Sequence, residues 1–217
     1  MGWVSAHFSE GGWGMWAILF ITTIPIIVIL FERVVVLVRA RIDKSRLVAL
    51  LKSQIMAGNV QGAIKVCAGN TVPLTRILQA GLAKYNRPDV EIQAAMDEAA
   101  LHELPLIEKR TGYLAMLGNL ATLLGLLGTI TGLIKSFKGV GGADPSQKAS
   151  LLAKGISEAM NCTAFGLGTG IVGLLIFALL NGMTQHLLDD INEVSVQIMN
   201  LVAAHKQAMK GGGSVAA

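Results

Sequence analysis

Two long segments without Asp, Glu, Lys or Arg constrain this chain more than any other feature of its sequence. They cover residues 111–134 and 159–188, and each is long enough to cross a bilayer, which takes roughly 20 mostly apolar residues. Both carry threonine and glycine where a simple membrane anchor would carry leucine. Hydroxyl groups and glycines gain nothing from lipid, but they suit close helix packing and a polar path between helices. The pattern therefore indicates transport across a membrane.

Composition supports a membrane protein. The chain is 53% hydrophobic and only 15% charged, whereas a soluble domain averages roughly 45–50% apolar and about 25% charged residues. A third apolar segment, residues 13–32, starts with Trp13 and Trp16, as in an aromatic belt, and Pro25 within it predicts a kink. We therefore predict an all-α integral membrane protein with three transmembrane helices and long cytoplasmic helical extensions.

Lysine and arginine predict the direction of the three spans. Residues 33–110 hold 12 of the 18 basic residues and residues 1–12 hold none, so 33–110 should be cytoplasmic and 1–12 external. Residues 135–158 then form an external loop with the start of the third helix, although their four lysines count against this direction. Residues 189–209 become a cytoplasmic helical extension, and the glycine-rich residues 210–217 a disordered tail.

The cytoplasmic region should be helical. Apolar spacing predicts helices from Ser45 to the Gly58-Asn59 pair, over residues 60–67, and over residues 73–85. A further helix from Asp89 is expected to bend at Pro105 and to run into the second span.

A seam with heptad spacing follows the third span. Its residues lie four and three apart, which predicts that the third helix continues and packs on another helix; they are Leu187, Ile191, Val194, Ile198 and Leu201. The partner helix can belong to the same chain or to another subunit.

Threonines are the candidate functional groups within the spans. Thr122 and Thr129 are seven residues apart and share a helix face, and Thr163 begins a similar face in the third span. A row of hydroxyls can hold water or guide an ion. Alternatively, these residues only pack, with their hydroxyls bonded to their own helix. Close helix packing is also the interpretation of the glycines in both spans, which are Gly125, Gly128, Gly132, Gly166 and Gly170.

Glu158 precedes the third apolar run and has two interpretations. It can collect cations at a pore mouth, or it can stabilise the positive end of a helix by lying in its first turn. Its position favours the second interpretation. Apart from His186, the second and third spans contain no acidic or basic side chain, so a chain that moves protons would need a partner to supply the intramembrane group that titrates. No arrangement typical of an enzyme, a metal site or a nucleic-acid interface is present in the sequence.

The chain resembles the MotA/TolQ/ExbB proton-channel family, and most of all its ExbB/TolQ branch. The resemblance covers nearly the whole chain and rests on the block around Gly125, Gly128 and Thr129 and on the Gly-Ile-Ser-Glu-Ala block that contains Glu158. Glycine and tryptophan before the first span and Glu32-Arg33 after it also match. One departure is Thr122, where the family often has proline.

The resemblance implies a ring of identical subunits, typically five, around two copies of an ExbD/TolR-like single-span partner that carries a membrane aspartate. It places Thr129 and Thr163 on pore-facing positions and Glu158 on the family's glutamate of the third span. The expected function is that of a proton-channel stator subunit in the bacterial inner membrane, without a cofactor and with H⁺ as the ion. A non-conducting oligomeric scaffold and a sodium-driven motor are the alternatives.

Overall fold

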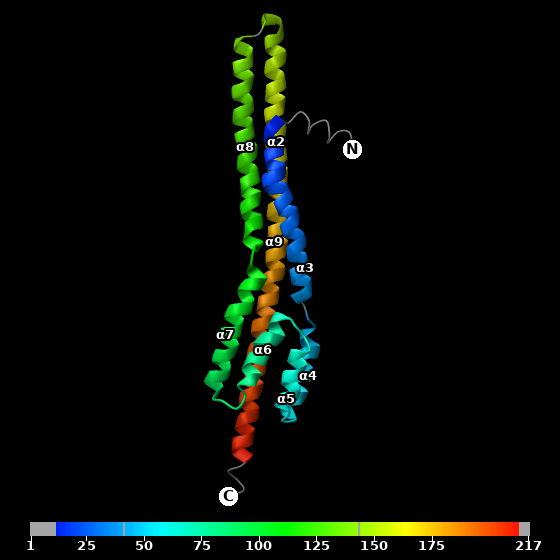
Figure 1. Cartoon of the computed structure of the whole chain (residues 1–217), viewed down its shortest axis with the longest axis vertical. Helices are drawn as coiled ribbons and strands as arrows, with labels where there is room; N and C mark the ends of the chain where they lie inside the picture. Colours follow the sequence, from blue (N-terminus) through cyan, green and yellow to red (C-terminus); the bar gives the residue numbers. More distant parts are fainter. Residues whose placement is uncertain (1–11, 41, 143, 213–217) are drawn as a thin grey trace. The chain divides into compact units, whose positions relative to one another are not determined.

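The fold is seen in a computed structural model that describes residues 12–40, 42–142 and 144–212 (Figure 1). Within these residues the chain is helical and has no strand. Three of its helical stretches are long and apolar enough to cross a membrane, so the chain is a multi-pass membrane protein. It divides into a first unit, residues 1–34 and 110–181, and a second unit, residues 35–109 and 182–217.

The first span is interrupted by a wide helical turn. Helix α2 (Gly12–Ile18) leads into the π-helical turn η1 (Leu19–Thr23), which is followed by α3 (Ile24–Ala40). The Thr22 hydroxyl donates to the Ile18 carbonyl oxygen over 2.6 Å, and the Ile24 N–H reaches back to the Leu19 carbonyl. Pro25 follows at once. A wide turn relieves the clash of the proline ring with the carbonyl four residues earlier, so the irregularity predicted at Pro25 is this π-helical turn.

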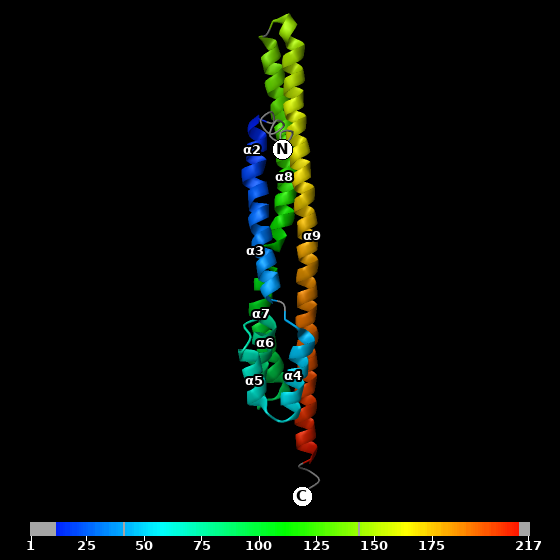
Figure 2. The same ribbon diagram turned by 90° about the vertical axis from the view of Figure 1, so that its right-hand side faces the viewer.

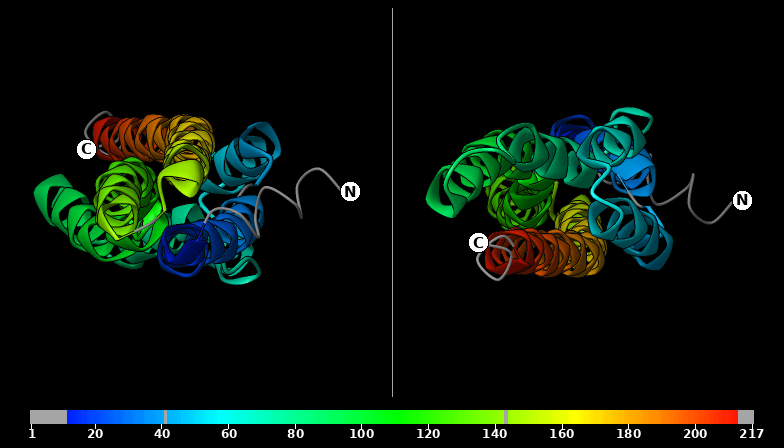
Figure 3. Two further views of the ribbon diagram at one scale, coloured as in Figure 1. Left: turned by 90° about the horizontal axis from the view of Figure 1, so that it is seen from above. Right: turned by 90° about the horizontal axis from the view of Figure 1, so that it is seen from below.

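Helices α8 (Thr111–Gly141) and α9 (Pro145–Gly212) form an antiparallel hairpin in the first unit. Seen end-on, α2 lies against this pair (Figure 3, left). Small residues line the contact on both helices. On α8 they are Gly118, Ala121, Gly125, Gly128, Gly132 and Ser136, and on α9 they are Gly155, Ala159, Cys162, Gly166 and Gly170.

The contact between α8 and α9 is made largely by backbone. A Cβ atom built on Gly166 would lie 2.7 Å from both the Ala121 carbonyl oxygen and the Gly125 Cα, and one on Gly118 would lie 3.0 Å from the Gly170 carbonyl oxygen. Distances this short leave no room for a side chain. The five glycines that the sequence marks for packing all lie in this contact.

The hairpin is longer than the sequence predicts. Residues 135–158 were expected to hold an external loop, but α8 continues to Gly141 and α9 already begins at Pro145. The small-residue contact explains the extension, because Ser136 still faces Gly155: a Cβ there would overlap the Ser136 hydroxyl. Both helices therefore continue to gain packing beyond the apolar segments.

The second unit is built from four short helices and the end of α9 (Figure 2). The short helices are α4 (Lys44–Met56), α5 (Val60–Ala68), α6 (Pro73–Ala83) and α7 (Asp89–Glu108). The side chains of Asp43 and Asn59 cap α4 and α5 by accepting backbone N–H bonds, and Gly58 turns the chain between them at φ +71°. The helices predicted in this region are therefore confirmed to within a few residues.

The seam predicted after the third span packs within its own unit. Ile191, Val194 and Ile198 are buried there as expected, but Leu187 and Leu201 are only half-buried. Their neighbours Leu188 and Val202 take the buried positions instead, because a straight helix with 3.6 residues per turn drifts from a strict heptad. Packing within the chain thus accounts for this seam. Helix α9 continues without a break to Gly212, past the predicted end at residue 209.

The helix from Asp89, expected to bend at Pro105 and to run into the second span, is interrupted before that span, but by a break at Lys109 and Arg110 and not by a bend at the proline. Helix α7 contains Pro105 in its last turn and ends at Glu108, and Arg110 then takes a left-handed conformation with φ 66° before α8 begins. A missing proline N–H and a left-handed residue both stop helical hydrogen bonding.

Two predicted segments cannot be compared with the structure. Residues 1–11, most of the predicted external segment, and residues 213–217 of the predicted tail lie outside the described residues.

Two neighbouring glycines test the small-residue contact. We expect Gly166→Ala to lower the free energy of unfolding by about 1–3 kcal/mol, because the added methyl group meets backbone atoms of α8. At Gly168 an added Cβ meets nothing within 4 Å, so Gly168→Ala should be neutral or stabilising. Thermal unfolding in detergent, followed by circular dichroism, gives both values. Equal effects of the two substitutions would contradict the proposed contact.

Candidate functional site

Two threonine hydroxyls meet at the centre of the α8–α9 hairpin. Thr129 on α8 and Thr163 on α9 are hydrogen bonded to each other through their Oγ1 atoms. Each Oγ1 also lies 3.1 Å from the Gly125 carbonyl oxygen. The glycine contact explains this arrangement, because Gly125 and Gly166 bring the two helices close enough for short side chains to touch. The structure thus joins the two threonines on which the resemblance places the pore.

The hydroxyl pair offers acceptors more readily than donors. Thr129 and Thr163 have one proton each, and these protons are engaged by the Gly125 carbonyl and by the contact between the hydroxyls. Oxygen lone pairs remain on both side chains, which are only half-buried. Part of each threonine side chain is exposed, and this exposed side of the pair is called its open side. A group that approaches the pair from its open side therefore meets acceptor oxygens. Such a site suits a cation, a water molecule or a protonated carboxyl group, and disfavours a carboxylate.

Thr122 is not part of this pair. Its hydroxyl donates to the Gly118 carbonyl of its own helix over 3.4 Å, and its Oγ1 lies 2.5 Å from where a Cβ of Gly170 would be. Thr122 therefore fills space beside a glycine, as in the packing interpretation. The sequence grouped it with Thr129 because the two share a helix face, but only Thr129 lies opposite a second threonine.

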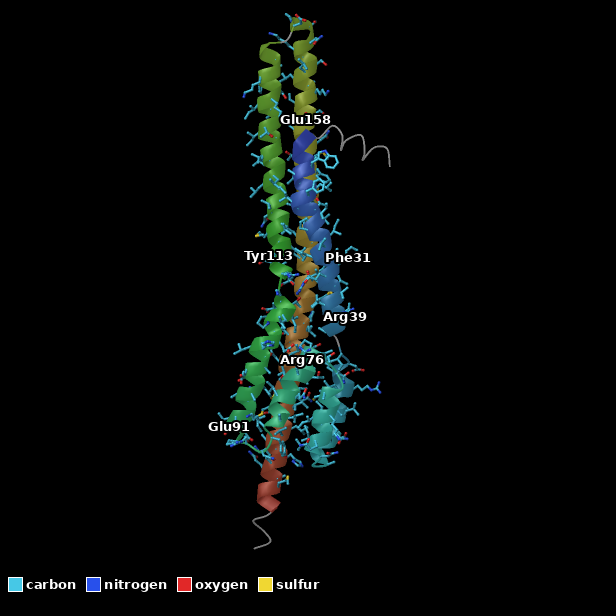
Figure 4. The ribbon with its side chains drawn as sticks, viewed as in Figure 1. Phe31, Arg39, Arg76, Glu91, Tyr113 and Glu158 are labelled. Carbon is cyan, nitrogen blue, oxygen red and sulfur yellow. The ribbon has the colours of Figure 1, made fainter. Side chains whose placement is uncertain are left out.

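Glu158 does not lie in the first turn of a helix. Because α9 begins at Pro145, Glu158 follows more than three turns of helix, where the effect of the helix dipole has faded. The expectation that it stabilises a helix start is therefore wrong. Figure 4 shows Glu158 on α9, towards the hairpin end of the first unit. It is half-buried.

A small cavity adjoins Glu158. Its volume of about 10 Å³ approaches that of a single water-sized probe sphere. Polar groups of Thr131, Lys135 and Glu158 line it together with Cys162 and small residues of α2 and α8. Glu158 thus lies beside a small polar cavity of the hairpin, one helical turn before Cys162 in α9.

An ion pair closes the opposite end of the first unit. Both carboxylate oxygens of Glu32 lie 2.7 Å from one guanidinium nitrogen, Nη1, of Arg110. The exposed aromatic side chains of Phe31 and Tyr113 are found beside it (Figure 4). The pair fixes the left-handed Arg110 at the start of α8. Sequence analysis missed this contact, although Glu32 and Arg110 each adjoin a predicted span.

His186, the one titratable group predicted within the third span, lies in the second unit. It lines a cavity of about 240 Å³ with Lys44 and Asp190. Lys44 binds the carboxylates of Asp190 and Glu193 over 2.6 and 2.9 Å, and these hydrogen bonds raise the pKa of Lys44. The described α8 and α9 segments around the hydroxyl pair contain no acidic or basic side chain between Arg110 and Lys135 or between Glu158 and His186.

Comparison with known proteins agrees with this architecture. The protein named "Putative biopolymer transport protein ExbB-like 3" from Synechocystis sp. (strain ATCC 27184 / PCC 6803 / Kazusa) is 30% identical over 119 residues. That match covers 54% of this chain and 57% of the relative, so the chain spans little more than half of that protein's length. The sequence model of the MotA/TolQ/ExbB proton channel family matches residues 70–193, which include α8, the hydroxyl pair and most of α9. The chain therefore belongs to the MotA/TolQ/ExbB proton channel family.

Proposed function

We propose that this chain is the proton-channel stator subunit of an inner-membrane motor that couples the proton motive force to mechanical work in the cell envelope. It acts as a ring of identical copies, with five as the expected number, around two copies of an ExbD/TolR-like single-span partner. The N-terminus is external and the C-terminus cytoplasmic. The work done is biopolymer transport, envelope maintenance or motility.

The observation that carries the proposal is the Thr129–Thr163 hydroxyl pair on the Gly125 carbonyl. It is a polar acceptor site between segments of the hairpin that contain no Asp, Glu, Lys or Arg, residues 111–134 and 159–188. A proton needs a titratable carrier to cross a membrane. A partner aspartate would bring that carrier, and its protonated form is the one that the acceptor oxygens favour.

The packing of the hairpin supports a path outside it. Backbone approaches backbone at Gly118, Gly125 and Gly166, which leaves no space for water between α8 and α9 of one chain. An ion therefore passes along the open side of the hydroxyl pair, between this chain and a neighbour. Protonation of the partner carboxyl would loosen its hold on water and permit the partner helices to rotate within the ring.

A sodium-driven motor is the alternative within the same family. Thr129, Thr163 and Gly125 provide three oxygen atoms near one point, and hard cations prefer oxygen ligands. A non-conducting scaffold that oligomerises through its glycine faces is the alternative outside this class, but these glycines already lie in the contact between α8 and α9 of one chain. A scaffold would function in membranes without a potential, whereas a motor would not.

Copurification of the partner tests the motor directly. Isolation of the chain from its native membrane in mild detergent should yield a small protein with one apolar span and an aspartate within it, identified by mass spectrometry. An intact ring without such a protein would shift the assignment to a scaffold.

Replacement of the two threonines tests the site. We expect Thr129→Val and Thr163→Val each to abolish proton flux in vesicles that contain the chain and its partner, because valine keeps the shape and removes the acceptor oxygens. Assembly should persist. Thr131→Val is the matched control, since the Thr131 hydroxyl bonds the Gly128 carbonyl of its own helix and should leave flux near normal. Normal flux in both test variants would remove the assigned role.

Glu158 is tested by Glu158→Gln, which keeps the size of the side chain and removes its charge. We expect a several-fold slower flux at limiting external proton concentration, because an acid at the mouth of a path concentrates cations. Flux at saturating proton concentration should change less. A variant with unchanged flux under both conditions would show that Glu158 has only a structural role.

A further inference from the structure

The outer part of the α8–α9 hairpin carries a group of lysines that the proposed function does not use. Residues 132–158 contain four lysines and two carboxylates, Asp144 and Glu158, and Glu158 lines the same small cavity as Lys135. The lysines are Lys135, Lys138, Lys148 and Lys154, and all four are exposed. No salt bridge within the described part of the chain involves them. In the orientation proposed above, they lie on the external side of the membrane, where positive charge is normally scarce.

Large apolar side chains are interleaved with these lysines. Phe137 is 65% exposed and Ile134 is 49% exposed on α8. Leu151 and Ile156 are exposed on α9. Water is a poor environment for such side chains, so a surface that mixes them with lysines fits a boundary between apolar and polar surroundings.

The length of α8 places this surface at the level of lipid headgroups. A hydrocarbon layer of about 30 Å takes 20 residues of helix at 1.5 Å each. Counted from the Glu32–Arg110 pair, the layer ends near Thr131. Lys135 and Lys138 follow one to two helical turns later, about 6–10 Å further along the helix, at and just beyond the level of the phosphate groups.

The position of helix α2 places the edge of the hydrocarbon layer at the same level. Helix α2 starts at Gly12, and Gly14 lies against Gly128, 3.6 Å from a built Cβ to the Cα. Trp16 is half exposed next to this level and stacks on Phe20, as in an aromatic belt at the edge of a membrane. The backbone of the hairpin beyond Gly132 therefore lies outside the hydrocarbon layer, whereas the side chains of Ile134 and Phe137 lean towards the N-terminus of α8 and so point back to the edge of that layer. Lys154 adjoins Gly155, which faces Ser136, so it shares the level of Phe137 and Lys138.

We infer that Lys135, Lys138 and Lys154 form a binding surface for the phosphate groups of anionic phospholipids, with Phe137 and Ile134 inserted between the adjacent acyl chains. Charge complementarity and the depth of the apolar side chains both favour lipid over an acidic protein. Each lysine near an anionic lipid surface adds to the attraction. The surface also explains why these lysines do not reverse the direction of the helices: they are held by lipid at the membrane face where the hairpin emerges.

Lipid contact at position 137 tests the inference. The full-length chain carries Phe137→Trp, with its three native tryptophans replaced by phenylalanine, and is reconstituted into phosphatidylcholine vesicles with a minor fraction of phosphatidylglycerol. Brominated chains on one lipid or the other quench the new tryptophan, and the ratio gives the local composition. We expect phosphatidylglycerol beside residue 137 at about three times its bulk fraction or more, falling towards the bulk value at high salt.

Charge-neutral variants identify the lysines responsible. Lys135→Gln, Lys138→Gln and Lys154→Gln together should return the local composition to the bulk value. The control combines Lys52→Gln, Lys65→Gln and Lys84→Gln, three exposed lysines of the second unit with the same total change in charge, and should keep the enrichment. The inference would be overturned if the lipid beside residue 137 had the bulk composition in the chain with all its lysines. It would also be overturned if the control variant lost as much phosphatidylglycerol enrichment as the test variant. Absence of quenching by either lipid would also overturn it, since a protein would then cover the surface. None of these measurements needs ion flux or the partner, so their outcome is independent of the proposed function.

Discussion

Close approach of two backbones, α8 and α9, is the constraint on which the first unit depends. Glycine on both sides lets the helices meet where side chains would hold them apart. Dispersion between tightly packed atoms, and not the hydrophobic effect, stabilises such a contact in lipid. The same approach brings Thr129 within reach of Thr163, so the contact that holds the hairpin also assembles its polar site.

The close contact between α8 and α9 determines from which side the polar groups of the hairpin can be reached. The hydroxyl pair is accessible only from its open side, and the apolar segments that carry it, residues 111–134 and 159–188, contain no Asp, Glu, Lys or Arg. The match over residues 70–193 shows family membership; the wall of a path, with proton transfer left to another chain, is the role proposed above for this hairpin. Glu158 and the Glu32–Arg110 pair mark the two ends of this wall.

Much of this architecture was predictable because lipid imposes simple rules on a sequence. The lengths of the apolar segments predicted three spans. Asn59 and Gly58 predicted the end of one helix and the start of the next, where the structure has a cap and a turn. The errors arose where tertiary contacts override local signals. Ser136 and Gly155 extend the hairpin through a segment that reads as a loop, and this extension moved Glu158 from a helix start into a helix interior. The break at Arg110 depends on a left-handed residue held by Glu32, 78 positions away in the sequence, which no local pattern reveals.

The connections between the two units differ in stiffness. Helices α3 and α9 pass from one to the other without a break, whereas the chain leaves helical geometry at Lys109 and Arg110. An unbroken helix transmits twist and bending along its axis, but a chain that leaves helical geometry behaves as a joint. The first and third spans therefore each continue into the second unit as one helix, and only the second span is connected to it through a joint. In mechanical terms the chain has two continuous shafts and one hinge.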